Sequence, residues 1–305
     1  MLDESFSVLL EILRMGRPHF LGGGILLFLF GAGIAISGGG IADAQRIAFA
    51  YLALFAGQLS VSYSNDYFDA EVDRRAKRTL FSGGSGVLVR RPDLKPVAKK
   101  IALLLIAASM AFAIASVAFF GMPAEFLAVA ALGNLVGWFY SAPPLKLAYR
   151  GLGEISTSFT AGFLMPVTGF LAVAGGINWD FALFSVPLFL CGVSFILSVQ
   201  APDAESDRKG GKWTFAARNG GKSALALSAF AAACASLCFF AILFSGAWQG
   251  AALPWISAAS LLPALFGFAG LFFAKNRERR ALAAVIGVSA LFAFVFLADV
   301  ALFLS

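Results

Sequence analysis

The stretch Asn65-Asp66-Tyr67-Phe68-Asp69-Ala70-Glu71-Val72-Asp73 follows directly on a long apolar segment. Three of its residues, Asn65, Asp69 and Asp73, are spaced by four, so on a helix they lie along one face. Carboxylates are costly to place beside the hydrocarbon of a bilayer, and ionisable residues kept there are usually functional. The stretch therefore predicts a membrane-spanning helix that ends in a functional acidic site.

Composition places this stretch in a polytopic membrane protein. The chain has 305 residues, of which 60% are hydrophobic, and its mean hydropathy is +0.84. We expect one all-α domain over residues 1–305, with nine transmembrane helices around a central cavity. Apolar segments of about 18 residues or more can each cross a hydrocarbon core of ~30 Å. They lie at 18–37, 44–63, 97–119, 123–141, 153–175, 181–199, 223–245, 252–274 and 281–304.

The basic residues predict the orientation. With nine spans, the segment before the first span and every second loop lie on one side, and of the 23 basic residues only Arg46 falls on the other. Because Lys and Arg concentrate in cytoplasmic loops, we predict a multi-pass protein of the cell (inner) membrane whose N-terminus, acidic loops and cavity mouth are cytoplasmic. The net charge of +6 then reflects topology and contact with membrane lipid, and no nucleic acid partner is expected.

A second acidic set, Asp203 and Asp207, follows the sixth apolar segment, four spans after the second. Both sets fall on the same predicted side, as in a parallel duplication of a four-helix unit. Basic residues and glycines come after each set: Arg74, Arg75, Lys77, Arg78 and residues 82–86 in one loop, and Arg208, Lys209, Gly210, Gly211 and Lys212 in the other. Mg²⁺ prefers oxygen ligands and Lys and Arg neutralise phosphate, so these groups suit a Mg²⁺-diphosphate.

Three motifs in this order resemble the UbiA-type superfamily of intramembrane prenyltransferases. They are N-x-x-x-D-x-x-x-D after the second span, Tyr140-Ser141-Ala142-Pro143-Pro144-Leu145-Lys146 after the fourth, and D-x-x-x-D after the sixth. The resemblance covers nearly the whole chain. It implies a Mg²⁺-dependent transferase that moves an isoprenoid chain from a polyprenyl diphosphate to an acceptor, usually aromatic. No protein partner is predicted.

The resemblance also implies residue roles. Metal ligands would be Asn65, Asp69, Asp73, Asp203 and Asp207; the four aspartates and Tyr140 would be the catalytic residues. Tyr140 would contact the diphosphate or stabilise an allylic cation with its ring. The diphosphate contacts would be Asn65, Arg78, Lys146, Arg150, Arg208 and Lys212.

The residues around the second acidic set favour one branch of that superfamily. Asp203-x-x-x-Asp207-Arg208-x-x-Gly211-Lys212-x-Thr214 and Arg150-Gly151-Leu152-Gly153-Glu154 are similar to 1,4-dihydroxy-2-naphthoate prenyltransferases of menaquinone synthesis. Gln200, Ala201 and Pro202 depart from that branch, which has Asn-Asn and then an Arg before the aspartate. Other acceptors therefore stay open: 4-hydroxybenzoate, another quinone precursor, or a haem or lipid precursor.

A cation-coupled membrane transporter is the alternative from another class. Parallel repeats fit it, but its acids would lie at the membrane midplane, and here only Asp299 lies deep inside an apolar segment. The acidic motifs at the span ends favour the enzyme. Asn134 and Glu154 either line the cavity or pack between helices, and the sequence does not distinguish the two.

Overall fold

The computed structural model describes residues 2–74 and 84–305, and over these ranges the chain is helical without strands. Nine segments within them are long and apolar enough to cross a membrane, which confirms the predicted all-α class and the predicted number of spans. These segments are Phe20–Ser37, Ala44–Asp73, Pro92–Phe120, Ala124–Ser141, Gly153–Val173, Trp179–Lys209, Gly221–Ser245, Leu253–Phe273 and Arg277–Leu304.

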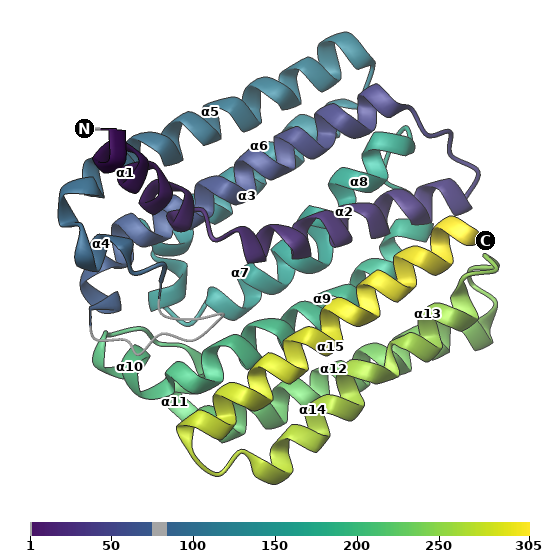
Figure 1. The fold of residues 1–305 in the computed structure, drawn as a ribbon. Coiled ribbons are helices and arrows are strands. Elements are labelled where there is room, and N and C mark those ends of the chain that lie inside the picture. Colours follow the sequence, from purple (N-terminus) through teal and green to yellow (C-terminus); the bar gives the residue numbers. More distant parts are fainter. Residues whose placement is uncertain (1, 75–83) are drawn as a thin grey trace.

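The elements follow one another along the chain as Figure 1 labels them. Their bounds are α1 (Leu2–Met15), α2 (Pro18–Ser37), α3 (Ala44–Asp73), α4 (Val87–Arg90), η1 (Pro92–Leu94), α5 (Lys95–Phe120), α6 (Ala124–Ser141), η2 (Leu147–Tyr149), α7 (Gly153–Phe159), η3 (Thr160–Leu164), α8 (Met165–Val173), α9 (Trp179–Gln200), η4 (Ala201–Asp203), α10 (Ala204–Lys209), α11 (Phe215–Asn219), α12 (Gly221–Ser245), α13 (Leu253–Ala259), α14 (Leu261–Phe273) and α15 (Arg277–Leu304).

The long helices form a bundle with an inner and an outer set. The inner set is α2, α3, α6, α7 with α8, α9 and α15, which together line a central cavity. Outside them, α5 packs on α3 and α6, while α12 packs on α9 and α14 packs on α12 and α15 (Figure 1). The helices that line the cavity therefore come from almost the whole length of the sequence, from α2 to α15.

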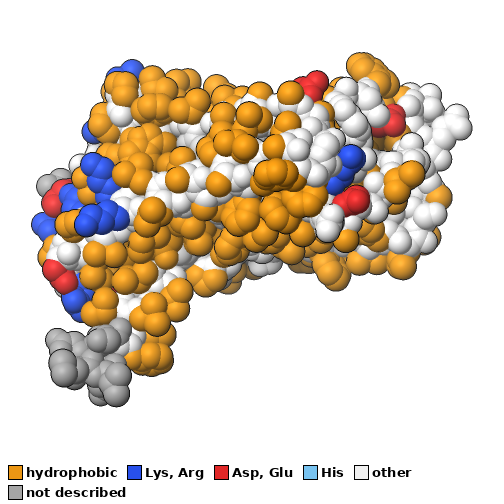
Figure 2. Space-filling model, turned by 90° about the horizontal axis from the view of Figure 1, so that it is seen from above, with side chains coloured by type: hydrophobic (Ala, Val, Ile, Leu, Met, Phe, Trp, Pro, Cys, Tyr) orange, Lys and Arg blue, Asp and Glu red, His pale blue; other side chains and the backbone are white. Residues whose placement is uncertain are grey.

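The surface of the bundle suits a lipid environment. Figure 2 shows hydrophobic side chains over the middle of the face in view, with most of the visible Lys and Arg at one end. Several of the most exposed apolar side chains, such as Leu104, Leu237 and Phe272, belong to the outer helices α5, α12 and α14. A water-soluble protein rarely exposes so continuous an apolar surface, so this belt fits a bilayer.

At the end that carries the basic residues, the helices differ from the predicted spans. The sequence predicted that the second span would stop at residue 63, but α3 continues to Asp73. Residues 58–73 contain neither Gly nor Pro, so nothing interrupts the helix when it leaves the apolar region. The first acidic set therefore lies on this same helix, as its four-residue spacing predicts.

Helix α1 was not anticipated by the sequence analysis. Its residue Met15 is fully buried, and the hydroxyl of Tyr63 on α3 donates to the carbonyl of Ile12 at 3.0 Å. The opposite side of α1 exposes Phe6, Leu9 and Leu13. Such an amphipathic helix suits the membrane–water interface; its span of 14 residues is too short to cross the membrane.

Helices α2 and α8 meet through a reciprocal pair of glycines. A Cβ atom at Gly31 would overlap the carbonyl oxygen of Pro166, and a Cβ atom at Gly169 would overlap the carbonyl oxygen of Phe28. Small residues of this kind let two membrane helices approach until their backbones touch. This contact holds the bent segment α7–η3–α8 against α2 on one side of the cavity.

We expect Gly31→Ala and Gly169→Ala each to lower the stability of the purified protein by at least about 2 kcal/mol, because an added methyl group overpacks the contact. The measurement is thermal unfolding in detergent. Gly22→Ala is the matched control on α2, since no atom lies within 4 Å of a Cβ atom there. Equal losses in all three variants would contradict this account of the helix contact.

Candidate functional site

The predicted central cavity is present and has two adjoining parts. The larger part, of about 370 Å³, is lined mostly by apolar side chains of the inner helices. The smaller part, of about 140 Å³, lies at the ends of α3 and α9 and is lined mostly by polar and charged residues. Both parts share Arg17, Asn65, Tyr140, Ile196 and Val199. We call the smaller part the polar pocket and the larger part the apolar cavity.

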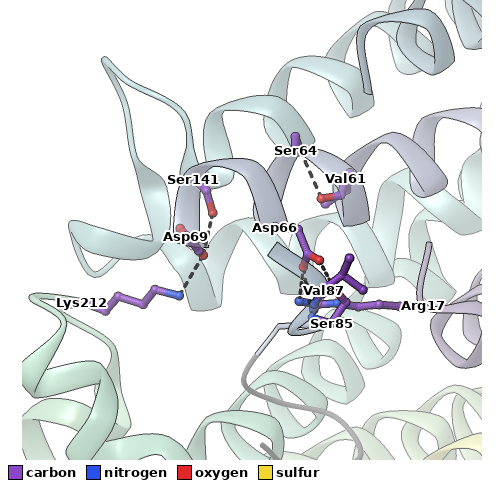
Figure 3. A network of polar contacts seen from close by, with 9 residues as sticks. All are labelled: Arg17, Val61, Ser64, Asp66, Asp69, Ser85, Val87, Ser141 and Lys212. Atoms are coloured by element: carbon purple, nitrogen blue, oxygen red, sulfur yellow. Dashed lines mark hydrogen bonds and ion pairs between the residues drawn. The ribbon is translucent and has the colours of Figure 1, made fainter. Parts of the chain in front are cut away.

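Asp69 is a heavily bonded carboxylate of the polar pocket. Its side chain is buried and accepts three hydrogen bonds, from the Ser141 hydroxyl at 3.1 Å, the Tyr149 hydroxyl at 2.8 Å and the Lys212 ammonium at 2.9 Å. Figure 3 shows Ser141 and Lys212 reaching Asp69 from different elements. One acid thus joins α3 to the end of α6, to η2 and to the loop after α10.

The charges around Asp69 fix the protonation of its partners. Burial alone would lower the pKa of Lys212, but the carboxylates of Asp69 and Asp207 outweigh it and raise that pKa above its ordinary value. Burial, and then the charge of Asp69, raise the pKa of the Tyr149 hydroxyl. Lys212 is therefore a cation and Tyr149 a neutral hydrogen-bond donor at physiological pH.

A second contact holds the chain after residue 83 over α3. Asp66 is buried and pairs with Arg17, whose guanidinium lies 2.7 Å away. Asp66 also accepts from the Ser85 backbone N–H at 3.2 Å and from the Ser85 hydroxyl (Figure 3). Next to it, Gly84 has φ of +65°, and a Cβ atom there would overlap the Asp73 carboxylate. Glycine suits this turn because it has no Cβ atom, and both Gly84 and Asp73 line the polar pocket.

The second acidic set enters the pocket because the helix breaks before it. Helix α9 ends at Gln200, and the short helical turn η4 (Ala201–Asp203), with Pro202 as its second residue, carries Asp203. The buried Asp203 carboxylate lies 3.7 Å from the Arg277 guanidinium, and Asp207 accepts from the Thr214 hydroxyl at 3.2 Å. Both acids line the polar pocket together with the first set.

Seven of the predicted site residues line the polar pocket: Asn65, Asp69, Asp73, Tyr140, Asp203, Asp207 and Lys212. Arg78 lies outside the described residues. Three predicted diphosphate contacts lie elsewhere, each for a local reason. Arg150 donates to the Pro144 carbonyl at 2.9 Å, and Arg208 donates to the Ala217 carbonyl at 2.7 Å, near the end of α11. Lys146 is exposed, and its ammonium lies 5.3 Å from the centre of the Tyr149 ring.

The sequence analysis gave no role to three residues that line the pocket, Arg17, Gln200 and Thr214. It also gave none to Ser141 and Tyr149, which bond to Asp69, or to Asp66 and Ser85, which bond to each other beside Arg17. Two signals were available. Arg17 precedes the first span directly, and Ser141 belongs to the quoted Tyr-Ser-x-Pro-Pro motif. Nothing in the local sequence points to Tyr149, which reaches Asp69 only because η2 folds back beneath α6.

The donor atoms of the pocket fit a divalent metal that binds together with a phosphate group. Asn65 Oδ1 and Gln200 Oε1 are buried and have no hydrogen-bond partner within the described part of the chain. Among the described residues, no group of three or more His, Cys, Asp or Glu side chains is close enough together to hold a metal ion by itself. Mg²⁺ usually takes one or two carboxylates and completes its shell with phosphate oxygens and water. The carboxylates and the two unpaired amide oxygens of the pocket are of the donor type that Mg²⁺ prefers.

Residues 25–300 match the UbiA prenyltransferase family. The chain belongs to this family. Its predicted class, a prenyltransferase enzyme, is thereby confirmed. It is also similar to the 1,4-dihydroxy-2-naphthoate octaprenyltransferase of Bacillus subtilis, with 29% identity over 245 residues that cover 80% of this chain and 75% of the relative.

Solved structures of the same fold include a UbiA homologue from Archaeoglobus fulgidus bound to GPP and Mg²⁺ (TM-score 0.67, 18% identity, 95% of this chain and 99% of that chain). A UbiA homologue from Aeropyrum pernix in its apo form gives a TM-score of 0.68 at 19% identity, over 92% of this chain and 97% of that chain. These similarities confirm the fold over nearly the full length.

Lys212 and Arg208 are close in the sequence, but only Lys212 lines the polar pocket, and this difference can be tested. We expect Lys212→Met to lower kcat about 100-fold, because it removes a cation beside the site of charge development. We expect Arg208→Met to keep near-wild-type turnover, because Arg208 bonds to a helix carbonyl outside the pocket. Steady-state prenyl transfer in detergent measures both. Equal loss of turnover in the two variants would contradict this assignment.

Proposed function

We propose that this prenyltransferase moves a polyprenyl group from a polyprenyl diphosphate to 1,4-dihydroxy-2-naphthoate in menaquinone biosynthesis, with Mg²⁺ as its cofactor. The observation that carries the proposal is that the polar pocket and the apolar cavity adjoin each other and share five lining residues. A charged head and a long apolar tail need a site of this divided kind. The relative from Bacillus subtilis, with its named naphthoate substrate, supports the choice of acceptor.

The donor would lie with its diphosphate in the polar pocket and its tail in the apolar cavity. The Archaeoglobus fulgidus homologues were solved with GPP or DMAPP and Mg²⁺, and the same class of donor suits this chain. Each CH₂ group of the tail that leaves water contributes about 0.8 kcal/mol. The apolar cavity therefore supplies binding free energy, while the polar pocket determines where the reacting carbon lies.

Asn65, Asp69, Asp73, Asp203 and Asp207 would hold the metal, with Gln200 as a further oxygen donor. Bound Mg²⁺ supplies Lewis-acid stabilisation of the diphosphate leaving group. Lys212 and Arg17 face the same pocket, and their charges stabilise the negative charge that builds on the departing oxygen. The C1–O bond breaks with its electron pair going to the diphosphate, which leaves an allylic cation at C1.

The residues between the two parts of the site would then guide the cation to the acceptor. Tyr140 lies where the polar pocket meets the apolar cavity, so its ring can stabilise a positive carbon. The apolar walls exclude water, which would otherwise capture the cation. The electron-rich ring of the acceptor attacks C1, and the ring then loses CO₂ or a proton to regain its aromaticity.

The same proposal covers placement in the cell. A single domain would span the cell (inner) membrane, with the N-terminus and the polar pocket on the cytoplasmic side, where the basic residues gather. Its ligands would be a polyprenyl diphosphate, an aromatic acceptor and the surrounding lipid, without a protein partner. A transporter is no longer retained, because the chain belongs to a prenyltransferase family. Another aromatic or lipid acceptor stays the alternative, because Gln200, Ala201 and Pro202 depart from the naphthoate branch.

We expect Asp73→Asn and Asp207→Asn each to reduce turnover at least about 100-fold and to weaken the response to Mg²⁺, because each removes a charged ligand from the pocket. The measurement is a Mg²⁺ titration of prenyl transfer. Glu71→Gln is the matched control: Glu71 lies on the same helix between Asp69 and Asp73, but its side chain is 70% exposed. A loss of activity in the control comparable with the other two would argue against a specific metal site.

The proposed reaction itself is tested with purified protein and geranylgeranyl diphosphate. Diphosphate release is measured with and without Mg²⁺ for a panel that contains 1,4-dihydroxy-2-naphthoate, 4-hydroxybenzoate and glyceryl phosphate. We expect Mg²⁺-dependent release with the naphthoate. Release with one of the other compounds alone would overturn the acceptor assignment, and no release with any compound would overturn the proposed reaction.

A further inference from the structure

Gly133 lies at the middle of the face that α6 turns towards the apolar cavity. The residues of α6 that line this cavity are Phe126, Val129, Ala130, Gly133, Asn134, Val136, Gly137 and Tyr140. Successive residues of a helix are turned by about 100°, so Gly133 points in a direction between those of the other members of this set. Leu135, which is 54% exposed, lies on the opposite side of the helix. A side chain at position 133 would therefore point into the cavity.

The space in front of Gly133 holds no protein atom. A Cβ atom at this position would have no neighbouring heavy atom within 4 Å among the described residues. The other glycines of the described cavity wall differ, because a Cβ atom at each of them would lie 3.2 Å or less from an atom of another helix. They are Gly23, Gly24, Gly57, Gly137 and Gly192. Close packing accounts for these glycines, but it does not account for Gly133.

The backbone of α6 does not require a glycine at this position either. Gly133 is not one of the described glycines with positive φ, a conformation that other residues rarely adopt. Inside a helix, glycine lowers stability relative to alanine. Neither the backbone nor a neighbouring residue excludes a side chain here. What the missing side chain leaves is free space in the cavity.

Gly133 also lies about half-way along the cavity. Tyr140 marks the end beside the polar pocket, since it lines both parts of the site. Phe126, which is fully buried, is the cavity-lining residue of α6 farthest from that end. Along a helix, Gly133 is about 10 Å and Phe126 about 21 Å from Tyr140. The free space at Gly133 therefore lies between the part of the cavity next to the polar pocket and its deep part.

The length of an isoprenoid tail can be compared with this depth. Each isoprenoid unit lengthens the chain by four carbon atoms, or about 5 Å when extended with C–C bonds of about 1.5 Å. With the diphosphate in the polar pocket, two units would reach from Tyr140 to Gly133. A third and a fourth unit would pass Gly133 towards Phe126. The cavity-lining residues of α6 on this deeper side, Ala130, Val129 and Phe126, are all apolar and suit such a tail.

We propose that Gly133 is a specificity-determining residue for the prenyl donor, because its missing side chain lets a tail of three or more isoprenoid units enter the deep part of the cavity. This inference rests on the proposed function, which places the tail in the apolar cavity. A larger side chain at position 133 would occupy the space that the third unit needs, and it would leave room for the first two. The residue selects donors by length and takes no part in the chemical step.

Gly133→Leu tests this role with donors of different length. We expect its kcat/KM for geranylgeranyl diphosphate to fall at least about tenfold and its kcat/KM for dimethylallyl diphosphate to stay within about twofold of the wild type, because a misfit of one methylene group in an apolar pocket already costs about tenfold. Gly133→Ala should give a smaller change in the same direction. Steady-state transfer to 1,4-dihydroxy-2-naphthoate with Mg²⁺ in detergent measures both constants.

Binding of the donor gives a readout that depends neither on turnover nor on the acceptor. With Mg²⁺ and no acceptor, geranylgeranyl diphosphate should raise the unfolding temperature of the wild type more than that of Gly133→Leu. Dimethylallyl diphosphate should raise the unfolding temperatures of the two proteins equally. The same thermal shift in both proteins with the long donor would contradict the proposed role.

Gly22→Leu is the matched control. It makes the same change on α2, at an exposed position outside the cavity wall where a Cβ atom also has no neighbour within 4 Å. This variant should keep the wild-type ratio of the two kcat/KM values. Both leucine variants replace a helical glycine, so without ligand each should unfold at or above the temperature of the wild type. A lower unfolding temperature for Gly133→Leu alone would show that the side chain meets protein atoms and would overturn the inference, as would an equal loss of kcat/KM for both donors.

The outcomes also distinguish this inference from the proposed function. Transfer of the geranylgeranyl group by the wild type, with the same ratio between the two donors in Gly133→Leu, would overturn only the role of Gly133. A wild-type protein that uses dimethylallyl diphosphate alone would likewise overturn that role and leave the reaction in place. A wild-type protein that transfers a prenyl group from neither donor to any acceptor would overturn the proposed function and, with it, the role of Gly133.

Discussion

The buried carboxylate of Asp69 is the interaction on which the polar end of this bundle depends. A charged group at 6% exposure must be paired, since loss of one partner from a buried ion pair typically costs about 3–5 kcal/mol. Its partners Ser141, Tyr149 and Lys212 come from three separate elements. To satisfy this one acid, the chain must bring those elements together, and doing so places Tyr140, Asp203 and Asp207 around the same pocket. The contacts that satisfy Asp69 are therefore also the contacts that pack the helix ends together and form the pocket.

In the apolar part of the molecule, the packing of the helices depends on shape and on small residues rather than on charge. Among helices in lipid, hydrophobic burial gives little preference for one arrangement over another, so shape and small residues decide the packing. The glycine contact between α2 and α8 brings two backbones together, whereas the six inner helical segments leave a space between them. The glycines thus have different uses: Gly31 and Gly169 close a helix contact, and Gly84 leaves space for the Asp73 carboxylate in the polar pocket.

The sequence predicted the features that depend on composition and on order along the chain. Nine apolar segments and two spaced acidic sets could be recognised because hydropathy and helical spacing are local properties. It did not predict that Tyr149 bonds to Asp69, that Arg17 bonds to Asp66, or that Arg208 bonds to Ala217 instead of facing the pocket. These depend on how η2, the start of α2 and α11 fold back on their neighbours. A run of basic residues shows that cations gather at one end, but only the fold selects the ones that enter the site.

The bonds of Asp69 also bear on its proposed role as a metal ligand. Its Oδ2 accepts from both Ser141 and Lys212, and its Oδ1 accepts from Tyr149 alone. A carboxylate oxygen has about two lone-pair directions, so a cation could approach Asp69 through Oδ1 without displacing Lys212. The remaining oxygen ligands must then come from other residues, and Asn65 Oδ1 and Gln200 Oε1 are buried acceptors without a partner within the described ranges. Lys212 can stay bonded to Asp69 while its ammonium, which has three donor positions, turns another towards the diphosphate. The pocket can therefore hold both kinds of positive charge at once, which a leaving group with several negative oxygens requires.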